Sequence, residues 1–395
     1  MENCKTMTDF DEILDRTGSG SVKWDVCRQE LGDDSLLPLW VADMDFRTPS
    51  FVNEEIEKLM SFGVLGYTGI TQRWYDAIMG WYSRRHSCEV SKDEMIFIPG
   101  IVRGIAFAEQ CFTVPGDRIL VMSPVYHPFF LVSRDNGREV VYNSLVLNEE
   151  TRQYDIDFEA LERQMTGCRM MIISNPHNPG GRVWTADELR RIAEIADEKG
   201  CLVISDEIHC DLTHSGHVHH PYFSVSGKAA SNSIVFGAPS KAFNMPGLVS
   251  SYAIVRNPEI FARFKSYLSA SEFDSGNMFA CNTCSACYEK GETWLEEMLE
   301  YVRGNYRFLN DFLKTRLPML STLDLQATYL VFLDCRALGL EQKDLVELFV
   351  RKAGIVLNDG TMFGPEGKGF MRLNIGCPRP MLREALERLE KAIRG

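Results

Sequence analysis

The sequence lacks three features that are typical of membrane proteins, nucleic-acid-binding proteins and secreted proteins. No apolar run approaches the roughly 20 residues of a membrane-spanning helix. Basic residues are outnumbered, with 42 Lys and Arg against 55 Asp and Glu and a net charge of −13, which disfavours nucleic acid and anionic membranes as partners. The first residues are acidic, with Asp9, Asp11 and Glu12, and lack the apolar centre of a signal peptide. These absences predict a cytoplasmic protein.

Cysteine and histidine are present without the pattern of a metal site. The 12 cysteines are scattered through expected strands and helices, so we expect reduced and mostly buried thiols, and no role for Cys4. Cys281, Cys284 and Cys287 have an iron–sulfur-like spacing, but a fourth ligand is lacking and they fall in an expected helix. Four histidines crowd residues 214–220, which we interpret as a solvated loop. We therefore expect no metal.

The chain of 395 residues is too long for one ordinary core. Its 45% hydrophobic and 25% charged residues are typical of a globular protein, and we find no internal repeat or low-complexity segment. We predict an N-terminal arm over residues 1–47 that joins the smaller domain. A large domain is predicted over 48–290 and a small C-terminal domain over 291–395.

Strand and helix patterns alternate through the middle of the chain. The clearest helix covers 186–199, where Thr185 and Glu188 form a capping box and Gly200 ends the helix. The strand–helix–strand order predicts a mostly parallel sheet. Further helices are predicted over 50–60, 76–86, 292–317 and from 381 onwards. Strands are predicted over 95–98, 118–122, 139–145, 169–173, 329–333 and 370–375, with two more before Asp206 and Lys241.

An acid and a lysine follow two consecutive apolar strands. Asp206 ends Leu-Val-Ile-Ser-Asp, and Lys241 follows Ile-Val-Phe-Gly-Ala-Pro-Ser. Open α/β sheets bind ligands at the carboxyl ends of their strands. Alone, such an acid could cap a helix and a lysine is usually solvated. Together they suit pyridoxal phosphate, which needs an amine for its aldehyde and an acid for its pyridine nitrogen.

Three further features fit the same ligand, although each has a plainer interpretation. Asn178 lies in the Asn-Pro-rich segment 175–181, which is either only a tight turn or a rigid loop that presents an amide to the phenolic oxygen of the cofactor. Residues 100–104 open a helix whose N–H groups suit a phosphate. Tyr126, between two prolines, could stack on a planar ring, although a lone tyrosine is more often a core residue.

These motifs together resemble the fold-type I pyridoxal-phosphate enzymes, and within them the cystalysin and MalY/PatB group of carbon–sulfur β-lyases. The resemblance covers essentially the whole chain and is carried by segments 21–25, 39–46, 66–69, 123–126, 176–184, 205–209, 239–244 and 372–374. It implies an α/β fold with a mostly parallel seven-stranded sheet in a three-layer large domain, a smaller α/β domain, and a homodimer.

The resemblance also implies roles for individual residues. Lys241 is similar to the lysine that bonds the cofactor and moves protons, Asp206 to the acid on the pyridine nitrogen, and Tyr126 to the tyrosine that stacks on the ring and can handle protons. Arg372 resembles the arginine that clamps the substrate carboxylate.

The remaining implied roles concern the two ends of the cofactor. Asn178 and His209 resemble the pair near the phenolic oxygen, and Asn178 and Tyr126 also face the substrate. The implied phosphate site comprises a helix start, a serine beside the lysine and a tyrosine lent across the dimer interface: Ile101, Val102, Arg103, Ser240 and Tyr67.

Three positions favour the lyases over class I aminotransferases, which usually have serine, arginine and tyrosine where this chain has Ala238, Val249 and His209. We therefore predict β-elimination from L-cystathionine, L-cysteine or a related cysteine S-conjugate, giving pyruvate, ammonia and a thiol. An aminotransferase, which shares every step up to the substrate carbanion, is the alternative. A non-catalytic cofactor-binding protein is a third interpretation, which the joint presence of these catalytic residues disfavours. The thiol, and whether Tyr126 or Lys241 protonates it, are left open.

Overall fold

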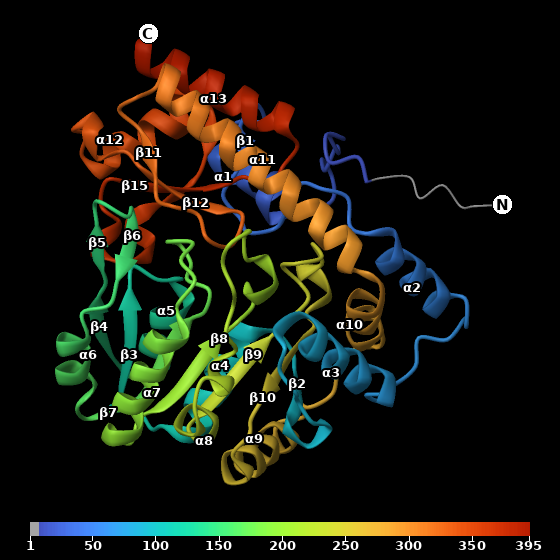
Figure 1. Ribbon diagram of the computed structural model, residues 1–395. Coiled ribbons are helices and arrows are strands. Elements are labelled where there is room, and N and C mark those ends of the chain that lie inside the picture. Colours follow the sequence, from blue (N-terminus) through green and yellow to red (C-terminus); the bar gives the residue numbers. More distant parts are fainter. Residues whose placement is uncertain (1–7) are drawn as a thin grey trace.

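The structure is a computed structural model that describes residues 8–395, shown in Figure 1. Cys4 and the start of the predicted arm lie outside these residues. The described residues form two main β-sheets, one of seven strands and one of four. Within residues 8–395, no helix combines the length and apolar character needed to cross a membrane.

The seven-stranded sheet is mostly parallel, as predicted. Six of its strands are almost entirely buried, as is typical of a sheet covered on both faces, and the edge strand over residues 139–144 is partly exposed. Only β10 (Ser251–Ile254) runs antiparallel, to both of its neighbours in this sheet. The order across the sheet is β2 (Met95–Ile98), β10 (Ser251–Ile254), β9 (Ser233–Gly237), β8 (Leu202–Asp206), β7 (Cys168–Ser174), β3 (Arg118–Ser123) and β4 (Glu139–Ser144).

Helices cover both faces of this sheet and form the predicted three layers (Figure 1). One face packs Ile98, Ile204 and Phe236 against α4 (Ile101–Phe112), α5 (Pro128–Asp135) and α9 (Pro258–Ala270). The other face packs Phe97 and Val203 against a second set of helices. These are α3 (Gln72–His86), α6 (Phe158–Met165), α7 (Ala186–Lys199), the short α8 (Gly227–Ser231) and α10 (Met278–Lys290).

Local sequence signals set some helix boundaries better than others. The predicted capping box of α7 is present, with the Glu188 N–H donating to Thr185 Oγ1 at 3.2 Å, and Gly200 ends the helix at φ +63°. Helix α2 (Ser50–Met60) also matches its predicted range. The predicted start of α3 at residue 76 was wrong, because the helix begins at Gln72. Trp74, fully buried against the sheet, stabilises this first turn through a tertiary contact.

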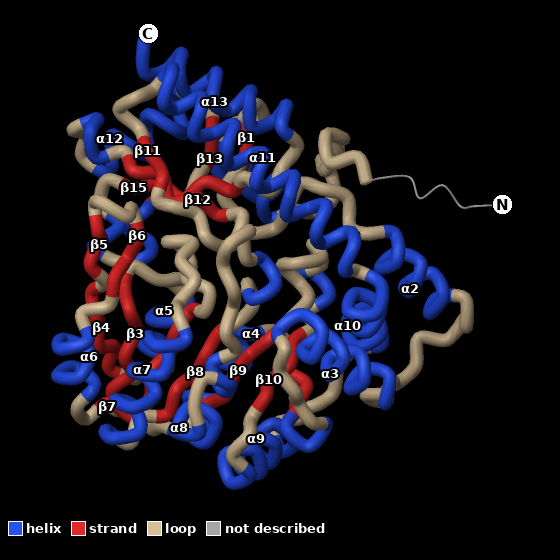
Figure 2. Tube along the Cα trace, viewed as in Figure 1, coloured by secondary structure: helices blue, strands red, loops and turns tan. Residues whose placement is uncertain are grey.

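The four-stranded sheet is antiparallel and lies beside long helices, as Figure 2 shows. Its order is β11 (Ser321–Thr322), β12 (Leu330–Asp334), β15 (Phe370–Asn374) and β14 (Asn358–Asp359). Nearby helices are α1 (Cys27–Leu31), α11 (Glu292–Arg316), α12 (Gln342–Glu347) and α13 (Arg379–Arg394). Elsewhere in the chain, β5 (Val146–Asn148) and β6 (Gln153–Asp155) form a separate antiparallel hairpin.

The N-terminal segment is tied to the C-terminal part of the chain. Strand β1 (Leu37–Pro38) pairs in parallel with β13 (Ile355–Val356). Beyond β1, residues 39–46 have no regular secondary structure, and a buried ion pair between Lys23 Nζ and Asp45 Oδ2, 2.6 Å long, holds them. This arrangement accords with an arm on the smaller domain, although the domain boundaries stay a prediction.

Candidate active site

One cavity lies where five strands of the large sheet end. Strands β2, β3, β7, β8 and β9 all point their carboxyl ends towards it, which is the place where open α/β sheets bind ligands. The segment before β10 and one arm residue, Ala42, complete the wall. Most of the predicted site residues line this cavity: Lys241, Asp206, Asn178, His209, Tyr126, Ile101, Val102 and Ser240.

Asp206 is a buried carboxylate at the end of β8, opposite Phe236 of β9. Its Oδ1 accepts a hydrogen bond from the N–H of Ile208 at 3.0 Å, so it closes a local turn and caps no helix. Burial raises the pKa of Asp206 to about 7, while the Ile208 bond and the charge of Lys241 oppose the rise. A cationic N–H partner would stabilise the ionised form of this buried carboxylate.

Lys241 follows β9 and extends its amine towards the arm. Nζ donates to the carbonyl oxygen of Ala42 at 2.6 Å. Burial lowers the pKa of Lys241 to about 8, although the charges of Asp43 and Asp206 oppose the change. A much larger neutral fraction than in a solvated lysine is therefore present near pH 8, and the neutral amine is the form that attacks an aldehyde.

Arg372 reaches the site from β15 of the small sheet and is 3% exposed. Its guanidinium donates to Asn178 Oδ1 at 3.0 Å, to Asn358 Oδ1 at 2.7 Å and to the carbonyl of Trp40 at 3.1 Å. All three acceptors are neutral, and Nε has no partner. Burial lowers the pKa of Arg372 to about 10, which leaves it cationic at neutral pH. A buried cation with neutral partners is suited to a carboxylate ligand.

His209 and Tyr126 lie on the cavity wall as expected. His209 is buried, its Nδ1 has no hydrogen-bond partner, and burial lowers its pKa to about 3, so the ring is neutral. The backbone N–H of Tyr126 donates to the carbonyl of Asn178 at 3.1 Å, which ties these two loops together. Burial raises the pKa of the Tyr126 hydroxyl, so it stays protonated.

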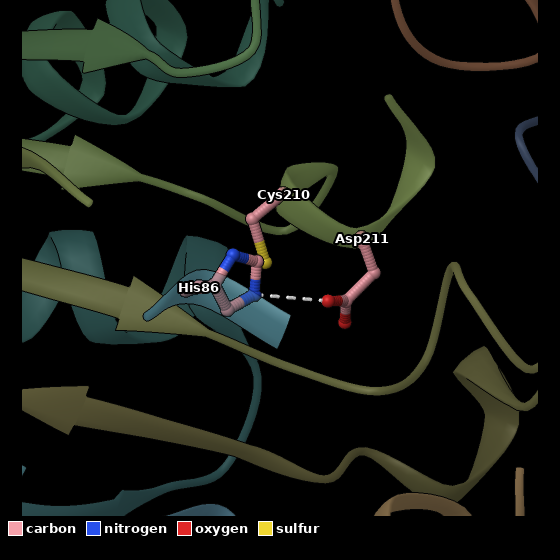
Figure 3. A group of neighbouring side chains, drawn as sticks. All are labelled: His86, Cys210 and Asp211. Carbon is pink, nitrogen blue, oxygen red and sulfur yellow. Dashed lines mark hydrogen bonds and ion pairs between the residues drawn. The ribbon is translucent and has the colours of Figure 1, made fainter. Parts of the chain in front are cut away.

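Figure 3 shows a group formed by His86, Cys210 and Asp211, the last two of which directly follow His209 in the chain. His86, Cys210 and Asp211 lie close enough together to suggest a metal site. However, Asp211 Oδ1 already accepts from His86 Nε2 at 3.0 Å and from Trp81 Nε1 at 2.9 Å, and the cation of Arg85 lies 3.6 Å away. We interpret this group as an anchor for the loop.

The predicted solvated histidine loop is wrong for two of its four histidines. His214 is buried and its Nε2 lies 2.8 Å from the carbonyl of Thr328. His219 is buried and its Nε2 lies 2.9 Å from Glu207 Oε2. Both acceptors belong to other segments, which composition alone does not reveal.

The three closely spaced cysteines lie on α10, as predicted, and all are buried. Cys287 Sγ contacts Met245 Sδ at 3.4 Å. Their environment is that of core residues.

The α4 end of the cavity suits a phosphate group. Gly100 precedes α4 with φ +99°, and a Cβ there would also approach Val249 Cγ1 to 3.3 Å. The backbone N–H groups at this helix start favour an anion. Three predicted residues do not line the cavity: Arg372, which contacts it through Asn178, and also Arg103 and Tyr67. The Arg103 side chain is exposed and donates to the carbonyl of Pro99, and Tyr67 is fully exposed elsewhere.

Sequence reasoning missed three site groups. Asn358 Oδ1 accepts a hydrogen bond from the Arg372 guanidinium. The carbonyl oxygen of Ala42 accepts hydrogen bonds from Lys241 and from the Tyr329 hydroxyl. Ala42 lies in a motif that the sequence analysis used, but a motif does not say which carbonyl faces a distant lysine.

Known proteins are similar to this chain over nearly its whole length. The profile described as "Aminotransferase class I and II" matches residues 38–389. The chain belongs to that family. It is 39% identical over 386 residues to cystathionine beta-lyase PatB of Bacillus subtilis (strain 168), covering 97% of this chain and 99% of that protein. It is 30% identical to protein MalY of Escherichia coli (strain K12), covering 98% and 99%.

Solved structures agree with these relatives. Cystalysin from Treponema denticola, which contains pyridoxal 5'-phosphate, is similar with a TM-score of 0.95 and 33% identity, covering 98% of this chain and 99% of that one. The PLP-bound C-S lyase from Staphylococcus hominis gives a TM-score of 0.91 and 31% identity, covering 99% of both chains.

The residues present here fit that cofactor. Asp206 offers a buried carboxylate for the pyridine N–H, and the free Nδ1 of neutral His209 leaves a polar atom available in the wall. Lys241 offers a partly neutral amine, and the start of α4 after Gly100 offers N–H groups for the phosphate. Each group has chemistry that pyridoxal phosphate can use.

Lys241 should react with pyridoxal phosphate at lower pH than a solvated lysine does. Because only the neutral amine attacks and its pKa is about 8, the rate of cofactor attachment to cofactor-free protein should rise with pH and level off above about pH 9. Stopped-flow absorbance in the visible range measures this rate, with Lys241→Ala as the unreactive control. A rate that climbs steadily to about pH 10.5, the region of ordinary lysines, would contradict the role of burial.

Proposed function

We propose that the protein is a pyridoxal-phosphate-dependent carbon–sulfur β-lyase. Its substrates are L-cystathionine, L-cysteine or related cysteine S-conjugates, and its products are pyruvate, ammonia and a thiol, either homocysteine or hydrogen sulfide. The observation that carries this proposal is the buried Arg372, a cation with neutral partners, one of which, Asn178, lines the same cavity as Asp206 and Lys241. The full-length similarity to PatB and to C-S lyase structures supports the reaction class.

Substrate binding begins at Arg372. Its guanidinium takes the α-carboxylate of the amino acid, with the amide of Asn178 beside it. Arg372 comes from the small sheet and Lys241 from the large one, so this contact places the substrate Cα between the two sheets and near Nζ. Such positioning replaces a bimolecular encounter by a reaction within one complex.

The bond-breaking steps need a base, an electron sink and an acid. Pyridoxal phosphate, when bound, supplies an aldehyde for the substrate amino group and a ring that withdraws electrons from Cα. The Asp206 carboxylate keeps the proton on the pyridine nitrogen. Lys241 Nζ removes the proton from Cα, after which the Cβ–S bond breaks. The thiolate then takes a proton from the Lys241 ammonium or from the Tyr126 hydroxyl, which burial keeps protonated. The remaining 2-aminoacrylate is released and reacts with water to give pyruvate and ammonia.

Product analysis tests the reaction class. The purified yellow protein should release pyruvate and homocysteine from L-cystathionine continuously and in equal amounts, without an added keto acid. Lys241→Ala should abolish turnover. A single turnover that bleaches the cofactor and resumes when a keto acid is added would contradict the lyase and establish the aminotransferase alternative.

A homodimer that completes the phosphate site forms part of the proposal. Tyr67 lies in an exposed apolar segment, where side chains are 59% exposed or more: Met60, Phe62, Val64, Leu65 and Tyr67. Contiguous exposed apolar groups mark interaction surfaces. In the proposed dimer, Tyr67 of the partner subunit contacts the cofactor phosphate near Ser240.

Hybrid dimers test the contribution across the interface. Tyr67→Ala and Lys241→Ala should each be nearly inactive alone. Co-refolded in equal amounts, they should regain about one quarter of wild-type activity, because half of the dimers are hybrids and each hybrid has one intact site. Mixtures that stay inactive, or an active monomer in gel filtration, would contradict the shared site.

We also propose a cytoplasmic location. Every cysteine within residues 8–395 is a free thiol, which accords with a reducing compartment. Activity in the cytoplasmic fraction of broken cells would support this location, and activity recovered mainly outside the cell would contradict it.

A further inference from the structure

The carbonyl oxygen of Ala42 accepts two hydrogen bonds that come from different sheets. Lys241 Nζ, beyond β9 of the large sheet, donates to it at 2.6 Å. The hydroxyl of Tyr329, which directly precedes β12 of the small sheet, donates to the same oxygen at 3.0 Å. Tyr329 is 1% exposed, and burial raises its pKa, so the hydroxyl remains a donor. One arm carbonyl therefore joins the reactive amine to a phenol with no role in the mechanism above.

The peptides on both sides of Ala42 are fixed as well. The amide of Asn374 donates to the carbonyl of Val41 at 2.7 Å and to the carbonyl of Asp43 at 2.8 Å. Lys23 Nζ adds a second bond to the Asp43 carbonyl at 2.9 Å. The segment has no strand partner here, so side chains supply the hydrogen bonds that its backbone requires. The Ala42 carbonyl cannot turn away without disturbing this set of bonds.

A fixed acceptor beside an amine controls where the amine points. A neutral amine that donates one N–H to a carbonyl keeps its lone pair free and directed elsewhere. Once the amine has taken a proton, the resulting ammonium makes a stronger, charge-assisted bond to the same oxygen. A general base must lie within hydrogen-bond reach of the proton that it removes, so its orientation affects the rate.

We propose that the Ala42 carbonyl holds the amine of Lys241 whenever that amine is free of cofactor, and that Tyr329 is a positioning residue for this carbonyl. The Tyr329 hydroxyl then determines how well Lys241 is aimed at the substrate Cα–H bond. The inference rests on the proposed function only for removal of the Cα proton, a step that the aminotransferase alternative shares.

The test compares two tyrosines in the holoenzyme. Tyr329→Phe removes only the hydroxyl bonded to Ala42. Tyr306→Phe is the matched control, because its hydroxyl also donates to a backbone carbonyl, that of Leu323 at 2.8 Å, and it does not line the cavity. Rapid-mixing single turnovers with L-cystathionine carrying protium or deuterium at Cα measure proton removal directly.

Tyr329→Phe should slow Cα proton removal about tenfold, with a full deuterium isotope effect on that step, while KM and the absorbance of the bound cofactor stay unchanged. Tyr306→Phe should match the wild type. A wild-type rate of proton removal in Tyr329→Phe, or equal slowing in both variants, would overturn the inference.

A second variant covers the case in which Tyr329→Phe does not fold. Asn374→Ala removes both amide bonds beside Ala42 and should slow the same step, and a wild-type rate in this variant would also overturn the inference.

Failure of the proposed function gives a different result. A wild-type protein that removes no Cα proton from the amino acid refutes the enzyme itself, whereas the inference fails only if removal occurs and ignores these substitutions.

Discussion

The burial of an acid and an amine at the ends of neighbouring strands is the constraint on which the rest of the site depends. Removal from water favours the uncharged forms of both groups, raising the pKa of Asp206 to about 7 and lowering that of Lys241 to about 8. A ligand with a protonated pyridine nitrogen would pair with the acid, and its aldehyde would react with the amine. The parallel strands β8 and β9 therefore bury an acid and an amine side by side. Binding of pyridoxal phosphate would offset the cost of removing these two groups from water.

The small sheet and the arm adapt this cavity to an amino acid. Arg372 of β15 is buried among neutral acceptors, and its hydrogen bonds tie it to Asn178, in the loop after β7 of the large sheet, and to Trp40 of the arm. The arm has no regular secondary structure at this point, yet side chains from both sheets bind its carbonyls. Lys241 and Arg372 are thus both held by backbone carbonyls of one irregular segment, residues 39–46.

Sequence patterns predicted the parts of the structure that depend on neighbouring residues. The apolar strands and the capping box of α7 are local signals, and the acid and the lysine predicted at strand ends line one cavity. The start of α3 was wrong because Trp74 stabilises it through tertiary packing. The buried His214 and the carbonyl of Ala42 depend on partners more than a hundred residues away, at Thr328 and Lys241. Such contacts arise only when the whole chain has folded.

The turnover of Asp206→Asn tests the central claim most directly. The neutral amide is nearly the same size as the carboxylate but cannot pair with a cationic pyridine nitrogen. The substituted protein should still bind the cofactor through Lys241 and remain coloured, while the rate of pyruvate release falls by about 10³-fold, because the charge that supports the ring proton is gone. Wild-type turnover in Asp206→Asn would contradict the account that the strand-end acid, together with Lys241, drives the reaction.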